Sequence, residues 1–268
     1  MDRIESIDFC IRYLMQQESV DVEIPTALED KQRLLRALMN IWSPQPQSEV
    51  FIKAQDAELQ VQLADKGIVS ISNFEFRNSN LPASKFNFQN SKLALWQGDI
   101  TRLKVDAIVN AANSQGLGCW HPLHGCIDNA IHSAAGLQLR QECNDILKGG
   151  TIDTGEAIIT KGYNLPAKYV IHTVGPIVTD GRPTIEQREQ LANCYRNCLA
   201  IAQANGCHTI AFCCISTGVF GYPNREAAEL AVETVRHSLF TNHYSLKVIF
   251  NVFKDIDYDI YRELLGTH

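Results

Sequence analysis

Apolar residues recur at helical spacing in the first part of the chain. They do so over residues 4–15 and again over residues 26–42, where the stripe consists of Leu28, Leu34, Leu35, Leu38 and Ile41. Two prolines within residues 43–48 then end any helix, which predicts a linker. Residues 51–64 mix helical and strand periods, so no element is assigned to them. We expect residues 1–90 to form a largely helical N-terminal extension.

Short β-rich runs alternate with longer amphipathic segments over residues 91–268. The β-rich runs are residues 93–96, 107–110, 156–160, 169–174, 209–214 and 247–252. The helical segments are residues 127–147, 184–205, 225–240 and 256–265. This alternation predicts a layered α/β domain. In such a sheet, ligands bind beyond the carboxyl ends of the strands, so we expect the site in the loops that follow them.

Composition and charge narrow the classes of function. The formal net charge of −6 argues against nucleic acid as a partner, because a mainly electrostatic binder would be basic. Residues 1–6 include acids and lead into no cleavable apolar segment, and no later apolar run approaches the ~20 residues of a membrane span. Nine cysteines, an odd number, fit free thiols better than a disulfide framework. These features predict a cytoplasmic protein with no membrane partner.

The stretch Cys-Trp-His-Pro-Leu-His-Gly-Cys, residues 119–126, gathers candidate metal ligands. Cys119, His124 and Cys126 offer two thiolates and one imidazole, a set that suits Zn²⁺ and leaves a fourth tetrahedral position for water or substrate. His121 lies in the same stretch and could close the site. The cysteines could instead be small buried hydrophobes, but a loop rich in glycine and proline offers little apolar packing. We therefore predict one zinc ion here.

Four segments in chain order resemble a macrodomain. They are residues 93–101, 105–113, 131–136 and 215–223, and the resemblance spans roughly residues 91–265. The spacing of the cysteines and histidine in the loop resembles the zinc-containing, sirtuin-associated branch of microbial ADP-ribosyl hydrolases, whose relatives without zinc carry a glycine-rich loop there. The resemblance implies a three-layer α/β/α domain with a central mixed sheet.

The same resemblance implies a set of ligand-binding residues. It assigns Asp99 and Ile100, with the Asp99 carboxylate accepting from the adenine amino group, although an aspartate there is also a common turn or cap residue. Asn113 offers an amide to ribose hydroxyls. Backbone amides of the loop 216–221 would cradle a diphosphate, although an isolated pattern of this kind could be an ordinary strand-to-helix turn. Its members are Ser216, Thr217, Gly218, Val219, Phe220 and Gly221.

Asp128 is the candidate acid or base for catalysis. It lies two residues beyond Cys126, where the resemblance places a catalytic aspartate of hydrolases that lack zinc. It could equally cap the helix that follows. Asn113 joins Asp128 in the catalytic set. His132 and His172 are interpreted as structural histidines, because each lies in a segment that must pack into the domain.

These assignments imply a zinc-dependent hydrolase that removes mono-ADP-ribose from modified protein side chains, with acidic residues as the expected linkage. Zinc would either activate a water or grip the distal ribose, and the sequence does not separate the two. The alternatives are a non-catalytic ADP-ribose-binding module with a structural zinc, and a redox or zinc sensor, which leaves the adenine and phosphate elements unexplained. The expected partners are ADP-ribose and a mono-ADP-ribosylated protein. The family also associates with sirtuin-like ADP-ribosyltransferases and lipoyl carrier proteins.

Overall fold

The computed structural model describes residues 2–73 and 92–266, and its first three helices form the N-terminal extension. These helices are α1 (Arg3–Glu18), α2 (Leu28–Ile41) and α3 (Glu49–Lys66). The first two confirm the helices expected from the apolar pattern, and residues 43–48 lie outside any helix as predicted. The boundary expected near residue 90 lies outside the described residues.

Helix α3 is the element that the apolar pattern did not assign. Its first turn is capped by Ser48, whose hydroxyl accepts from the amide of Phe51 at 3.2 Å. Its buried face mixes apolar Phe51 with polar Gln55 and Glu58, which are 0% and 2% exposed. Because polar residues occupy buried positions, the helical period of apolar residues is blurred in the sequence.

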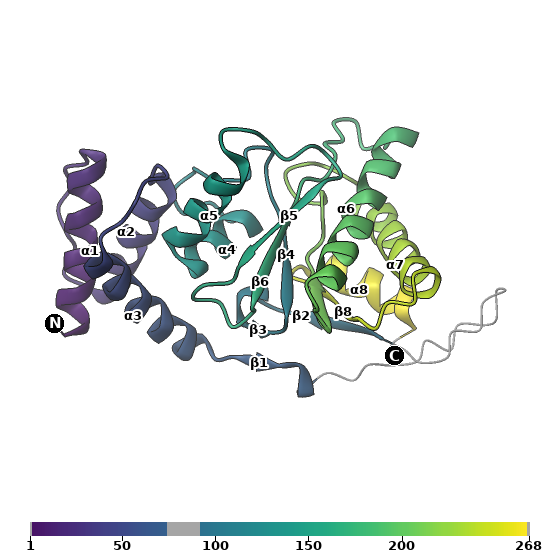
Figure 1. The fold of residues 1–268 in the computed structure, drawn as a ribbon, viewed down its shortest axis with the longest axis horizontal. Coiled ribbons are helices and arrows are strands. Elements are labelled where there is room, and N and C mark those ends of the chain that lie inside the picture. Colours follow the sequence, from purple (N-terminus) through teal and green to yellow (C-terminus); the bar gives the residue numbers. More distant parts are fainter. Residues whose placement is uncertain (1, 74–91, 267–268) are drawn as a thin grey trace.

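The extension has an apolar core of its own. Tyr13 stacks on Phe51 with ring centroids 4.6 Å apart, and Trp42 stacks beside them. The same buried cluster includes Leu137, which belongs to the following domain. Figure 1 shows the extension at one end of the molecule, next to the two helices that begin at residues 127 and 137. It is therefore joined to the domain by shared packing.

A six-stranded sheet forms the centre of the second part of the chain. Its strands are β2 (Leu93–Gln97), β4 (Ala107–Ala111), β5 (Ala157–Lys161), β6 (Tyr169–Thr173), β7 (Thr209–Phe212) and β8 (Lys247–Val252). Their order is β2-β8-β7-β4-β6-β5, and all pairs are parallel except β5 with β6. The expected mixed sheet is confirmed. A separate short pair joins β1 (Val69–Ser70) to β3 (Leu103–Lys104) in parallel.

Helices cover both faces of this sheet. They are α4 (Ile127–Ala135), α5 (Leu137–Leu147), α6 (Ile185–Ala204), α7 (Asn224–Thr241) and α8 (Asp255–Leu265). Figure 1 shows α4 and α5 between the extension and the sheet, with α6, α7 and α8 on the other side. The three-layer α/β/α architecture is thus confirmed. The single helix expected over residues 127–147 was wrong, because Gly136 has φ 98° and separates α4 from α5.

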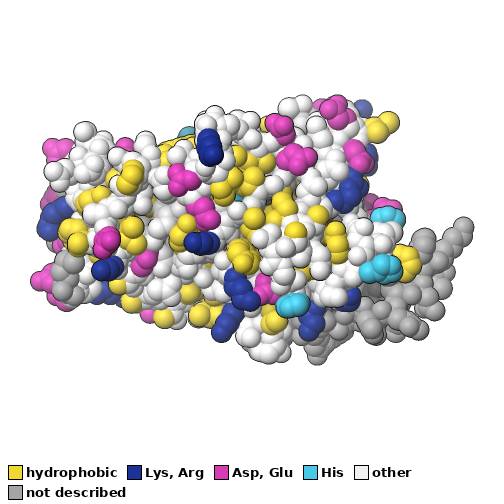
Figure 2. Space-filling model, viewed as in Figure 1, with side chains coloured by type: hydrophobic (Ala, Val, Ile, Leu, Met, Phe, Trp, Pro, Cys, Tyr) yellow, Lys and Arg dark blue, Asp and Glu magenta, His cyan; other side chains and the backbone are white. Residues whose placement is uncertain are grey.

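The surface carries charges of both signs. Figure 2 shows acidic and basic side chains interspersed over the extension and over the sheet-containing domain. Within the described residues, no helix combines the length and the apolar character needed to span a bilayer.

Candidate functional site

A cleft of about 1280 Å³ lies between the loops that follow the strands and the N-terminal extension. It is larger than the roughly 300–1,000 Å³ typical of small-molecule sites. Most of the residues singled out in the sequence line it, namely Asp99, Ile100, Asn113, Cys119, His124, Cys126, Asp128, Ser216, Thr217, Gly218, Val219 and Phe220. The structure therefore brings together groups that are up to 121 positions apart in the chain.

Gly221 is the one predicted ligand-binding residue that does not line the cleft. Its amide donates to the carbonyl oxygen of Gly218 at 3.1 Å, and its φ is 67°. A Cβ atom at this position would lie 2.5 Å from the carbonyl oxygen of Val178. Glycine is thus required by the shape of the turn, and Gly221 acts on the loop rather than facing the cleft.

The three candidate zinc ligands form one cluster at the N-terminus of α4. The ligand atoms of Cys119, His124 and Cys126 all lie within 4.8 Å of one another, and Cys119 Sγ is 3.5 Å from His124 Nδ1. A sulfur at about 2.3 Å and a nitrogen at about 2.0 Å from a tetrahedral zinc would be about 3.5 Å apart. The side chains present therefore fit one zinc ion.

His121 does not belong to this cluster. Its ring centroid lies 6.0 Å from that of His124, and its ring is outside the group whose ligand atoms lie close together. Its backbone carbonyl instead accepts from the amide of His124 and from the side chain of Asn129. The described geometry leaves three protein ligands.

Asp128 lies in the first turn of α4 and is 4% exposed. Its Oδ1 accepts from Asn110 Nδ2 at 2.7 Å, and its Oδ2 accepts from Asn113 Nδ2 at 3.2 Å. Burial raises the pKa of this carboxyl to about 6, against the lowering effects of the Asn110 hydrogen bond and the Arg140 charge. The helix is capped by Cys126, whose sulfur accepts from Asn129 N, so the alternative that Asp128 caps the helix was wrong.

His172 and His132 lie beneath this carboxylate in the domain core. His172 is fully buried, with Nδ1 3.1 Å from Asn110 Nδ2 and Nε2 3.0 Å from Thr160 Oγ1. Burial lowers the pKa of His172 to about 3. His132, His172 and Cys143 also bring their ligand atoms within 4.8 Å, but none of the three lines the cleft. The burial of both histidines and the contacts of His172 fit a structural role, whereas neither ring nitrogen of His132 has a hydrogen-bond partner among the described residues.

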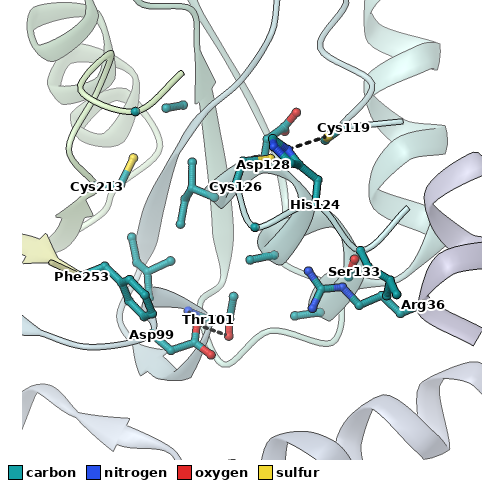
Figure 3. Close-up of a pocket in the computed structure, with 18 of the residues that line it drawn as sticks. Arg36, Asp99, Thr101, Cys119, His124, Cys126, Asp128, Ser133, Cys213 and Phe253 are labelled. Atoms are coloured by element: carbon teal, nitrogen blue, oxygen red, sulfur yellow. Dashed lines mark hydrogen bonds between the residues drawn. The ribbon is translucent and has the colours of Figure 1, made fainter. Parts of the chain in front are cut away.

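Asp99 lies where the chain leaves β2, at the opposite end of the cleft from the zinc cluster. Its Oδ1 accepts from the amide and hydroxyl of Thr101 at 3.0 and 2.6 Å, so it caps the short 3-10 helix Ile100–Arg102. Its Oδ2 is 3.6 Å from Lys66 Nζ. Figure 3 shows Asp99 beside Phe253 at this end and Cys119, His124 and Cys126 at the other. Asp99 thus serves as a cap with one oxygen, while its second oxygen is paired with Lys66, another residue that lines the cleft.

The loop that follows β7 turns sharply at Ser216, which has φ 64°. Carbonyl oxygens of Ser216 and Phe220 accept from Tyr222 N and Val178 N at 3.0 and 2.7 Å. In the described part of the chain, the amides of residues 217–220 have no hydrogen-bond partner, while the carbonyls are used to fix the turn. Successive unpaired amides form a concavity suited to an anion.

The N-terminal extension contributes a wall of the cleft that the sequence did not indicate. The lining residues of α2 and α3 include Gln32, Arg33, Arg36, Gln62, Leu63 and Lys66. Figure 3 shows Arg36 reaching from its helix toward the cleft, next to Ser133. Polar residues on the outer face of an amphipathic helix ordinarily face solvent, so the pattern carried no signal that this face meets a second domain.

Comparison with known proteins yields matches over most of the chain. Residues 109–231 match the Macro domain family. The "Protein-ADP-ribose hydrolase" of Treponema medium is 45% identical over 262 residues, covering 96% of this chain and 97% of that protein. The crystal structure of the Trypanosoma brucei macrodomain in complex with ADP-ribose is 32% identical, with a TM-score of 0.65 and coverage of 86% of this chain and 95% of that one. The Oceanobacillus iheyensis macrodomain with ADP is 42% identical, with a TM-score of 0.57 and coverage of 65% and 90%.

Two of these matches reach into the extension. Residues 91–268 make up only about two-thirds of the 268 residues, so matches that cover 86% and 96% of the chain must include part of residues 1–90. The similarity to these two relatives therefore extends beyond the sheet-containing domain into the extension.

Proposed function

The chain belongs to the macrodomain family, and we propose that it is a zinc-dependent hydrolase that removes mono-ADP-ribose from modified protein side chains, with acidic residues as the preferred linkage. The observation that carries the proposal is the single cleft joining Asp99 at one end to Cys119, His124 and Cys126 at the other, with Asp128 beside the cluster. The name of the Treponema medium relative, which matches along nearly its whole length, supports the same activity.

ADP-ribose would lie along this cleft in one orientation. Asp99 Oδ2 accepts from the adenine amino group, and Ile100 lies beside it in the cleft wall. The unpaired amides of residues 217–220 hold the diphosphate without a lysine. Asn113 then meets a hydroxyl of the distal ribose next to the zinc cluster. This order follows from the positions of these groups along the cleft.

Hydrolysis takes place at the anomeric carbon of the distal ribose. Cys119, His124 and Cys126 would hold the zinc ion, which would supply a Lewis acid at this end of the cleft. Asp128 accepts a hydrogen bond from the attacking water and aims it at the anomeric carbon. Asn110 and Asn113 hold both oxygens of Asp128 in place, which provides the fixed geometry that such a step needs.

The setting proposed for this activity is the cytoplasm. All nine cysteines are unpaired in the structure, which suits a compartment that keeps thiols reduced. The substrate is a mono-ADP-ribosylated protein. The sirtuin-like ADP-ribosyltransferase and the lipoyl carrier protein implied by the resemblance stay predictions.

Release of ADP-ribose from modified proteins tests the proposal. Proteins carrying acid-linked, serine-linked or arginine-linked ADP-ribose are incubated with the enzyme as purified, after chelation, and after zinc is restored. We expect release from the acid-linked substrate, loss of release on chelation, and recovery with zinc. Tight binding of ADP-ribose with no release from any substrate would instead assign the cleft to a binding module.

A further inference from the structure

The loop of residues 118–126, called the zinc loop below, lacks a scaffold of its own. It contains no helix or strand. Among the described residues, its internal backbone hydrogen bonds are limited to one, from His124 N to the carbonyl oxygen of His121 at 3.2 Å. His124 is exposed and Cys119 and Cys126 are half-buried, so burial of the loop does not fix its shape either. Contacts with other elements must do so.

The most direct of these contacts comes from Asn40 in the last turn of α2. Its side chain is 1% exposed, and its Oδ1 accepts from Leu123 N at 2.9 Å. Its Nδ2 donates to Ser133 Oγ on α4 at 2.9 Å. Leu123 has φ 58°, a left-handed conformation that costs a non-glycine residue about 1 kcal/mol. The Asn40 hydrogen bond therefore stabilises a strained bend directly before the ligand His124.

A second link starts one turn earlier, at Arg36. Its Nη2 and Nε donate to Asn129 Oδ1 at 2.6 and 3.1 Å. Asn129 is fully buried, and its Nδ2 donates to the carbonyl oxygen of His121 at 3.0 Å. The chain of bonds thus runs from α2 through α4 to the backbone of the zinc loop.

A third link involves Arg140 of α5. Its Nη1 donates to carbonyl oxygens at the C-terminal end of α2, those of Met39, Asn40 and Trp42, at 2.6 to 3.2 Å. Its guanidinium carbon lies 4.2 Å from the ring centroid of Trp120, the residue after the ligand Cys119. Burial lowers the pKa of Arg140 to about 10, so it keeps its charge at neutral pH. The same cation therefore holds the end of α2 and the start of the loop.

We propose that helix α2 of the extension holds the zinc loop in the conformation that binds zinc, with Asn40 as the positioning residue. This inference rests on the zinc site of the proposed function. A metal site requires its ligands within a few tenths of an ångström, and a loop that is free in the apo protein must lose conformational entropy when the ion binds. By ordering the loop beforehand, α2 raises the affinity for zinc. The extension then has a role in the site that does not depend on touching the substrate.

The zinc affinity of Asn40→Ala tests this proposal. Zn²⁺ is titrated into apo protein in competition with a chromophoric chelator, and Co²⁺ is bound in its place to record the absorption spectrum of the site. Loss of a group that orients metal ligands typically lowers affinity about 10-fold to 100-fold, so we expect a loss of at least about tenfold and a changed Co²⁺ spectrum. Asn40→Asp keeps an acceptor for Leu123 N and should recover most of the affinity.

Gln55→Ala is the matched control. Gln55 is a fully buried amide of α3, and its Oε1 accepts from a backbone amide of the domain, Leu137 N, at 3.0 Å. It does not contact the zinc loop. Gln55→Ala should cost stability as Asn40→Ala does, while leaving the zinc affinity and the Co²⁺ spectrum unchanged. Arg36→Met, at the edge of the cleft, gives a second test and should weaken zinc binding without endangering the fold.

The outcomes distinguish this inference from the function on which it rests. A wild-type protein without zinc affinity would overturn both the zinc site and the role of α2. If the wild type binds zinc normally, and Asn40→Ala and Arg36→Met have the same zinc affinity and the same Co²⁺ spectrum as the wild type, only the role of α2 is overturned. An equal loss of affinity in Gln55→Ala would do the same, since it would trace the effect to general destabilisation.

Discussion

The side-chain amide of Asn110 donates to Asp128 Oδ1 across 2.7 Å, joining the end of strand β4 to the first turn of helix α4. Asn110 is completely buried, and its amide nitrogen also contacts His172 Nδ1 at 3.1 Å. Asn113, three residues on, donates to the other oxygen of Asp128. One short segment therefore fixes the Asp128 carboxylate from both sides.

The first prediction concerns the metal. Purified protein should carry about one zinc per chain, because two thiolates and one imidazole at the observed spacing favour that ion. Cys119→Ala and Cys126→Ala should each lose it, as elemental analysis would record. His121→Ala, from the same loop but outside the ligand cluster, should keep it. If the His121 variant loses its zinc as completely as the cysteine variants do, the site has four protein ligands.

The second prediction concerns Asp99. Asp99→Ala should weaken ADP-ribose binding by roughly 1 to 3 kcal/mol, because the adenine amino group would lose its acceptor. Calorimetry on folded variants measures the effect. Asp99→Asn keeps an oxygen for the cap on Thr101 but presents a donor to the adenine, so it should also bind more weakly. Affinity unchanged in both variants would remove Asp99 from the binding site.

The third prediction concerns stability and His172. Burial lowers the pKa of His172 to about 3, whereas in the unfolded chain it is about 6.5. Between these values the unfolded state binds more protons, so the free energy of unfolding should decrease as the pH falls below about 6.5. The nearest titratable neighbours, His132 and Cys143, are present in the wild type and in the variant alike. Denaturant titrations of His172→Gln should show a weaker dependence on pH between 6.5 and 4.5. An identical slope in the two proteins would contradict the buried, neutral histidine.

Much of the fold could be predicted because central strands are buried along nearly their whole length and most helices bury a face of regularly spaced apolar residues. The strands β4, β6 and β7 are almost entirely buried and appear in the sequence as plain β-rich runs. Helix α3 could not be found this way, since Gln55 and Glu58 occupy its buried face and make hydrogen bonds and an ion pair there. The break at Gly136 was equally hidden, because a single glycine is compatible with a continuous helix.

The candidate site also has a part that could be predicted from the sequence and a part that could not. Residues next to a recognisable motif, such as Asp128 after Cys126, could be found from the sequence. Their bonding could not, because Asn110 and Asp128 are 18 positions apart and meet only in the folded chain. Asn40 and Arg36 gave no signal at all, since their partners Leu123 and Asn129 are 83 and 93 positions away.

The central claim is that the cleft hydrolyses a bond to ADP-ribose and does more than bind it. A group that acts only in the transition state should lower the rate when removed and leave ligand affinity nearly intact. Asp128→Asn keeps the shape of the side chain but loses the carboxylate that orients the water.

The most direct measurement is single-turnover loss of label from an ADP-ribosylated protein, made alongside calorimetry with free ADP-ribose for the wild type and Asp128→Asn. We predict release at least about 10²-fold slower in the variant with similar affinity for ADP-ribose. A wild-type protein that binds ADP-ribose without releasing it from any linkage, or a variant that is as fast as the wild type, would contradict the account.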